Sequence, residues 1–412
     1  MRRYMKFICF FLALVWGGCV FANTLETEND LEETDIQALR EWIYTKRQVT
    51  VSEKGGALSI SGEVRAEFQL TNETRNGIKQ RGLGSATGIP ARTYDVEVNL
   101  MMDYRTDRTW ASLKLEFDND AGVFSGSLNK IKLERAFIGV RLRDTGIYTV
   151  DAVIGRNSMS AFFDSKIEFG NFFDGILLKY DHNFEKIGDF YLHPAVFIID
   201  EKKDHYGYIV ELGMLDIADL GFYAKYSLID WNTKHYKKPK DNRRFDFLVS
   251  QVILGYKCIP EALKKPATFY MAGLCNHNAH KLQLTDQKRA NLGGYIGVSM
   301  GELKKKGDWA FDGNYQLVAA QAIPDFDNAG IGLGNANKSG LYRTNVDGTG
   351  ESTTRKNAGG NNNFRGFSLS FQYLLTNNLN VFQQWQQSMT LDASIGPFRR
   401  YKQYEIEFIY LF

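Results

Sequence analysis

From Leu58 to the end of the chain, apolar and polar residues alternate with a period of two in a series of short segments. In the first segment the apolar positions are Leu58, Ile60, Gly62, Val64, Ala66, Phe68 and Leu70. The positions between them carry serine, glutamate, arginine and glutamine. Because successive side chains of a strand point to opposite faces, this pattern predicts strands with one apolar and one polar face.

The same alternation recurs often enough to predict an all-β fold of about 16 strands. The predicted strands are 58–70, 94–105, 110–118, 130–142, 147–156, 175–181, 190–200, 206–216, 220–230, 245–259, 267–276, 291–300, 309–320, 364–375, 379–391 and 401–412. Their apolar faces carry aromatic residues near the strand ends, as in the girdles at membrane interfaces. Their polar faces carry charges in mid-strand, which a water-filled lumen accommodates. The pattern therefore predicts a transmembrane antiparallel β-barrel over residues 58–412.

The connections between the predicted strands are of two kinds. Tight turns of Asp, Asn and Gly occur at Thr106-Asp107-Arg108, Arg143-Asp144-Thr145-Gly146 and Thr376-Asn377-Asn378. They alternate with long polar loops at 71–93, 157–174, 231–244, 277–290 and 321–363. Short periplasmic turns and long external loops are typical of outer-membrane barrels. We therefore expect both chain ends in the periplasm and residues 157–174 as the third external loop.

The first 22 residues have the composition of a signal peptide. A basic start (Arg2, Arg3, Lys6) precedes an apolar stretch, and Val20-Phe21-Ala22 suits cleavage before Asn23. The alternative is lipidation of Cys19, which Trp16 disfavours because a small aliphatic residue is expected there. Either interpretation implies export, and together with the predicted barrel it leads us to expect the protein in the cell outer membrane of a Gram-negative bacterium.

Residues 23–57 form a predicted acidic periplasmic leader before the barrel. Within it, apolar residues at helical spacing predict a short helix over residues 23–48, with seven acids and three bases among residues 23–47. Two interpretations stand, a partly ordered leader and a helix for oligomerisation or cell-wall contact. Without its signal peptide the chain changes from +2 to −1, since it loses three basic residues and no acids. This small net charge gives no indication of nucleic-acid binding, so we expect no nucleic-acid partner.

The C-terminus is the most specific feature of the chain. Tyr404, Ile406, Phe408, Tyr410 and Phe412 fall on one face, and the last residue is aromatic. This pattern resembles the terminal signature of Gram-negative outer-membrane barrels, which the barrel assembly machinery recognises. The resemblance implies insertion into outer-membrane lipid, a fold in which the last strand closes the barrel, and a porin's assembly.

The segment KIKLERAFIGVRL from Lys130 to Leu142 and the following VDAVIGR to Arg156 resemble the strand pair before the third loop of porins. The similarity is greatest to the phosphate-selective O/P type, beside the general porins. It implies a third loop, residues 157–174, that folds inward and narrows the channel. Five phenylalanines in this loop are expected to pin it to the inner wall; the other interpretation is a plain surface loop.

Charges in these segments give the candidate pore-lining and constriction residues. A basic wall is expected to face acids of the loop; the candidates are Lys130, Lys132, Arg135, Arg141, Arg156, Asp164, Lys166 and Glu168. The lumen arginine ladder of the phosphate-selective family is not found in the sequence, so the mixture of charges favours general diffusion. We therefore predict a porin, expected as a homotrimer, for small hydrophilic solutes or ions. The alternative is a non-conducting surface adhesin or structural envelope protein with basic loops such as Lys234 to Arg244.

Other patterns predict no catalytic group, cofactor or metal site. Cys275, His277 and His280 lack a fourth ligand, and Gly330-Ile-Gly-Leu-Gly334 follows no strand-to-helix step. No histidine and serine are spaced as base and nucleophile on a lumen face, so we do not expect an enzyme. Cys258 and Cys275 are expected far apart on the two arms of one hairpin, and therefore as free thiols.

Overall fold

The computed structural model describes most of the chain after residue 48. The described residues are 49–53, 56–120, 130–201, 204–231, 247–279, 281, 288–324, 327–331, 362–393 and 397–412, all within one compact unit, Glu41–Phe412. The predicted signal peptide 1–22 and the predicted helix 23–48 lie outside them. At the end of the predicted leader, Val49–Glu53 is a strand, and Gly56 and Ala57 begin the next strand.

Among the described residues the named elements are strands and one short 3-10 helix. The bounds are β1 Val49–Glu53, β2 Gly56–Arg75, β3 Ile78–Lys79, β4 Arg92–Arg105, β5 Thr109–Asp120, β6 Lys130–Asp144, β7 Tyr148–Ser158, η1 Met159–Ala161, β8 Phe172–Phe184, β9 Gly188–Asp200, β10 His205–Ile217, β11 Phe222–Asp230, β12 Leu248–Cys258, β13 Ala267–Asn276, β14 Leu292–Gly301, β15 Trp309–Val318, β16 Phe364–Leu374, β17 Leu379–Thr390 and β18 Arg399–Leu411. Each of the sixteen predicted strands corresponds to one of β2 and β4–β18, so the predicted fold class is confirmed.

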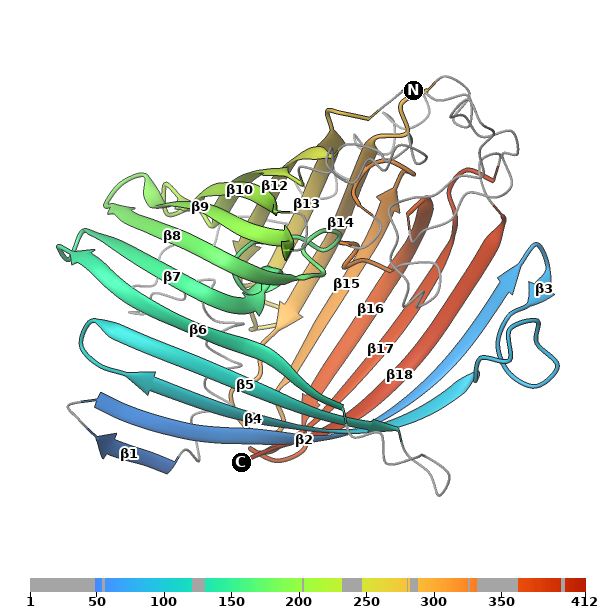
Figure 1. Cartoon of the computed structure of the whole chain (residues 1–412), viewed down its shortest axis with the longest axis horizontal. Helices are drawn as coiled ribbons and strands as arrows, with labels where there is room; N and C mark the ends of the chain where they lie inside the picture. The colour runs from blue at the N-terminus through green and yellow to red at the C-terminus, as the bar shows by residue number, and fades with distance from the viewer. Residues whose placement is uncertain are drawn as a thin grey trace. The chain divides into compact units, whose positions relative to one another are not determined.

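The sheet closes on itself into a barrel of 16 antiparallel strands. Each strand from β4 to β18 pairs with its neighbour in the chain, and β18 returns to β2 with Leu411 opposite Glu63 and Arg399 opposite Arg75. Figure 1 shows β18, in red, running beside β2, in blue. Closure removes the unpaired edges that an open sheet would leave exposed.

The two faces of the barrel wall follow the alternation in the sequence. Large apolar side chains such as Val64, Ile154 and Phe408 are exposed on the outer face. Polar and charged side chains on the opposite parity, such as Glu63 and Gln251, are buried on the inner face. In a soluble sandwich the apolar face would be the buried one, so the reversed pattern fits a wall between lipid and water.

Strand β1 extends the closing edge of the barrel. It pairs with the first residues of β2, with Val49 opposite Ile60 and Glu53 opposite Gly56. Just beyond, Gly62 donates to the carbonyl oxygen of Phe412 at 2.9 Å, and Phe412 donates back to Gly62 at 3.0 Å. Strands β1 and β18 therefore occupy successive stretches of the same edge of β2.

The connections differ between the two ends of the barrel, as predicted. One end, here called the turn end, carries the short connections, including 106–108, 145–147, 185–187 and 375–378. The other, the loop end, carries the long ones, but 201–204 is also short there. The third loop spans residues 159–171 rather than 157–174, because Asn157 and Ser158 continue the ladder with Phe173 and Phe172. Among the described residues no helix is long and apolar enough to cross a membrane.

Neither of the two described cysteines forms a disulfide, as predicted. Cys258 lies opposite Ala267 and Cys275 opposite Ser250 in the β12–β13 ladder. The two residues therefore lie near opposite ends of this hairpin, where no disulfide can join them.

Candidate functional site

The third loop leaves the wall between β7 and β8 and binds the inner face of the strands β10 to β12. The backbone N–H of Asp164 donates to Glu211 at 3.0 Å, and Lys225 lies 2.9 Å from the Asp164 carboxylate. Gln251 donates to the Asp164 carbonyl oxygen at 2.8 Å and accepts from Ser165 at 2.8 Å. Glu211, Lys225 and Gln251 are all buried on the inner face, so the loop lies inside the barrel.

The next residue of the loop extends these contacts to β15. Lys166 pairs with Asp312 at 3.2 Å, and its carbonyl oxygen accepts from Gln316 at 3.2 Å. Tyr270 of β13 donates to the same Asp312 carboxylate at 2.8 Å. Charge-assisted bonds at Asp164 and Lys166 thus hold the loop to two separate strands, β11 and β15.

Aromatic packing holds the other face of the loop. Phe163 is buried against Phe169 and Phe173, with ring centroids 5.6 Å and 6.3 Å away, and Phe162 lies 5.4 Å from Phe173. These rings belong to one buried cluster that continues through Phe197 to strands β9 and β10. Phe172 is the exception among the five phenylalanines, since it lies on the outer face with 44% exposure.

A second segment, residues 319–324 and 327–331, packs on the third loop, and no pattern in the sequence predicted this contact. Asp327 accepts from the Phe169 N–H and from Asn171, both at 3.1 Å, and its carbonyl oxygen accepts from Gly170 at 3.1 Å. Burial raises the pKa of Asp327 to about 8. The side chain of Glu168 is also fully buried, so it lies between the two segments instead of lining open space.

The predicted basic wall has local partners on the barrel itself. Lys132 forms ion pairs with Glu116 and Asp118 of β5, and Arg135 donates to Ser112 at 3.3 Å. No described contact joins them to the acids of the third loop. The side chain of Lys130 lies outside the described residues.

The remaining two arginines lie away from the loop's charged contacts. Arg141 binds Asp151 through two nitrogens, at 2.9 and 3.1 Å, near the turn end. Arg156 lies opposite Asp174 and shares the parity of the exposed Ile154, so it lies on the outer face. Its guanidinium pairs with Asp174 at 2.7 Å and sits 5.4 Å from the Phe172 ring. This position is at the rim of the barrel wall, outside the lumen.

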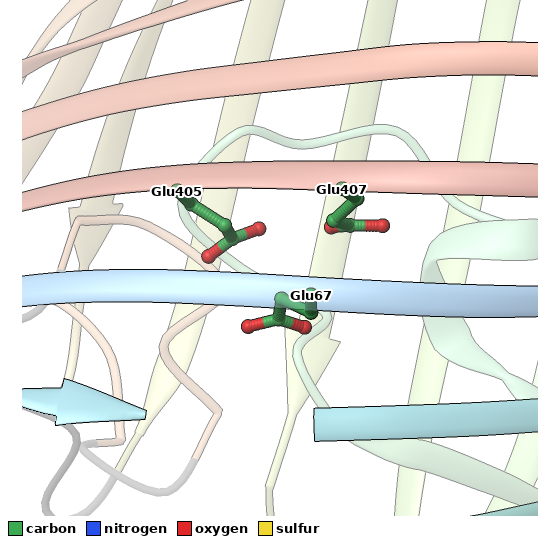
Figure 2. A group of neighbouring side chains, drawn as sticks. All are labelled: Glu67, Glu405 and Glu407. Carbon is green, nitrogen blue, oxygen red and sulfur yellow. The ribbon is translucent and has the colours of Figure 1, made fainter. Parts of the chain in front are cut away.

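A strongly acidic stretch of the inner wall lies where β18 meets β2. Glu67 lies directly opposite Glu407 of β18, and on its other side it lies opposite Asp95 of β4. Carboxylate oxygens of Glu67, Glu405 and Glu407 lie within 4.8 Å of one another. Figure 2 shows these three side chains facing one another across the two strands. Like charges directly opposite in a sheet destabilise it, so this arrangement carries a cost in folding.

Few cations balance this acidic stretch. Arg65 lies 2.6 Å from Glu63, 3.9 Å from Glu97 and 3.7 Å from Glu407. The neighbouring carboxylate of Glu405 accepts instead from the neutral amides of Gln69 at 2.9 Å and Gln403 at 3.0 Å. The alternation placed these acids on the lumen side, but only the closing register brings them together.

Comparison with known proteins relates this fold to solved porin structures. No family model and no curated protein matches the chain. The structure of OmpF from Salmonella typhi in complex with daunomycin is 13% identical, with a TM-score of 0.49 over 88% of this chain and 100% of that one. A mutant porin of Rh. blastica is 10% identical, with a TM-score of 0.42 over 86% and 100%. OprB from Pseudomonas putida, in a high-pH structure, is 10% identical, with a TM-score of 0.50 over 86% and 94%. At this identity the likeness is one of fold: the chain has the β-barrel fold of Gram-negative porins.

Proposed function

We propose that the protein forms a water-filled channel in the outer membrane of a Gram-negative bacterium, through which small hydrophilic solutes and ions diffuse passively. The observation that carries this proposal is the third loop, bound at Asp164 to Lys225 of β11 and at Lys166 to Asp312 of β15 on a polar inner wall. A loop fixed in this way narrows a lumen without closing it, and pore width together with the lining charges then decides what passes. The proposed channel is a homotrimer, and in each subunit both chain ends lie in the periplasm.

The lining charges favour cations over anions. In the middle of β18, β2, β4 and β5 the inner face carries the acids Glu63, Glu67, Asp95, Glu97, Glu116, Asp118, Glu405 and Glu407 and the bases Arg65 and Lys114. Counting also Lys132 of β6, which pairs with Glu116 and Asp118, eight acids still face three bases. Excess negative charge along a narrow aqueous path raises the local cation concentration. This balance also argues against the phosphate selectivity of the O/P type.

Conductance in a planar lipid bilayer tests the proposal. The purified protein is expected to insert in discrete conducting steps, and a potassium chloride gradient is expected to give a reversal potential of the sign for cation preference. Insertion without any conducting steps would contradict the channel. A reversal potential of the opposite sign would contradict the selectivity alone.

No described contact favours the alternative of a surface adhesin. The basic segment Lys234 to Arg244 that motivated it lies outside the described residues. The bilayer measurement also separates these functions, since an adhesin with a filled barrel carries no current.

A further inference from the structure

Two carboxyl groups are buried together where the third loop meets residues 327–331. Glu168 of the loop and Asp327 of the second segment are both 0% exposed. Buried acids are rare unless they are paired with a cation or protonated. Neither forms an ion pair with any cation in the described part of the chain, so their protonation state is coupled to how the loop is held.

Asp327 holds consecutive residues of the loop. Its carboxylate accepts from the Phe169 N–H and the Asn171 amide, and its carbonyl oxygen accepts from the Gly170 N–H, all at 3.1 Å. The Ala329 N–H adds a bond of 2.7 Å to the Ile167 carbonyl oxygen. These four bonds connect two segments more than 150 residues apart, and they are the means by which this half of the loop is fixed.

Glu168 makes no comparable contacts. Among the described residues, neither of its carboxylate oxygens has a hydrogen-bond partner. Its chain neighbours Ile167 and Phe169 are themselves fully buried. An ionised carboxylate in such a place would lack both water and donors, whereas a protonated one avoids the cost of the buried charge.

The charged groups near this junction do not supply a compensating cation. On the loop, Asp164 is paired with Lys225 of β11, and Lys166 with Asp312 of β15. Glu211 of β10 accepts from the Asp164 N–H and from Tyr191. From the second segment, Asp327 is the one described charge that acts on Glu168.

Burial therefore sets the protonation of the pair. It raises the pKa of Asp327 to about 8, and burial together with the neighbouring Asp327 charge raises the pKa of Glu168 well above the usual value. On a released, hydrated loop both groups would return to ordinary carboxyl values, near ~4. At a pH between the carboxyl pKa values of the released loop and those of the docked loop, the docked loop therefore holds protons that the released loop has lost.

We propose that Asp327 is a positioning residue for the third loop, and that ionisation of the Glu168–Asp327 pair releases the loop from its docked position. Acid then favours the docked loop and alkali the released one. The ratio of docked to released loop falls about tenfold per pH unit for each proton given up. The effect on current rests on the proposed channel function, whereas the release of the loop does not.

Hydrogen exchange on the full-length protein in detergent micelles tests the release directly. Amide protection of residues 159–171, corrected for the intrinsic pH dependence of exchange, is expected to fall at least about tenfold between pH 5 and pH 9. Glu168→Gln removes one titrating group without removing a described hydrogen bond, so its protection should fall less steeply. The double variant Glu168→Gln with Asp327→Asn should show no pH dependence, even if its protection is lower throughout.

Glu302→Gln, in a turn at the opposite end of the barrel, is the control and should keep the wild-type pH profile. Protection that is independent of pH in the wild type, or an unchanged slope in the double variant, would overturn the proposal. Single-channel conductance over the same pH range is expected to rise as protection falls. A pH-dependent loop in a protein that carries no current would contradict the channel function and support the loop release; a conducting channel with pH-independent protection would do the reverse.

Discussion

Replacing Phe163 by alanine should release the third loop while leaving the barrel wall intact. The ring is 2% exposed and packs on Phe162, Phe169 and Phe173. Truncating a buried phenylalanine costs about 3–5 kcal/mol, from lost transfer energy and the cavity left behind. Three of these four rings lie in the loop, so most of this cost falls on its docking, because the strand hydrogen bonds do not involve them.

The size of this effect makes it measurable. A loss of about 3 kcal/mol lowers the ratio of docked to released loop by about two powers of ten. A loop released for less than one part in a thousand of the time would then be released for several per cent of it. In single-channel recordings we expect frequent transient increases in current on an otherwise normal conductance.

Phe172→Ala is the matched control. This ring lies next to Phe173 in the chain but on the outer face, with 44% exposure, so its loss should leave the recordings unchanged. Recordings of Phe163→Ala that are indistinguishable from the wild type, with the barrel folded, would refute the role of the loop in narrowing the pore.

Three further changes test the lining, the wall and the closure. Glu67→Gln combined with Glu407→Gln removes two adjacent acids of the inner wall and should lower the cation preference severalfold at 0.1 M salt, seen as a smaller reversal potential. Gly175→Ala would place its Cβ 2.1 Å from a backbone oxygen and should reduce the yield of folded barrel, whereas Gly273→Ala, with nothing within 4 Å, should not. Deleting Phe412 removes two backbone bonds to β2 and should reduce assembly into the outer membrane, scored as heat-modifiable barrel, while the assembled fraction keeps its conductance.

Much of the barrel follows from the sequence because each wall strand separates lipid from water. That requirement acts residue by residue, so the alternation marks every strand locally and sets its inner and outer faces. Arg156 shows how strictly it applies. Its parity with Ile154 places it outside the lumen, whereas grouping it with nearby basic residues predicted a pore-lining position.

The candidate site was harder to predict from the sequence than the barrel, because its contacts join distant parts of the chain. Asp164 and Lys166 were identified as loop charges, but their partners Lys225 and Asp312 lie on strands that only closure brings near. The junction at Asp327 joins residues 158 positions apart, and no period or motif marks it. Glu168 was predicted to line the lumen because it is an acid in the third loop. In the structure it is fully buried by tertiary packing, which the sequence pattern does not indicate.

Strand β1 has a consequence for how the barrel finds its register. It occupies β2 as far as Ile60, and the last residue of the chain bonds to Gly62. A slip of β18 by one residue would turn its outward aromatics into the lumen. A slip of two residues toward β1 would keep the faces but drive Phe412 into a position that β1 already fills. Strand β1, the first described strand, thus limits the register of β18, and it excludes one misregistered barrel that the alternation alone would permit.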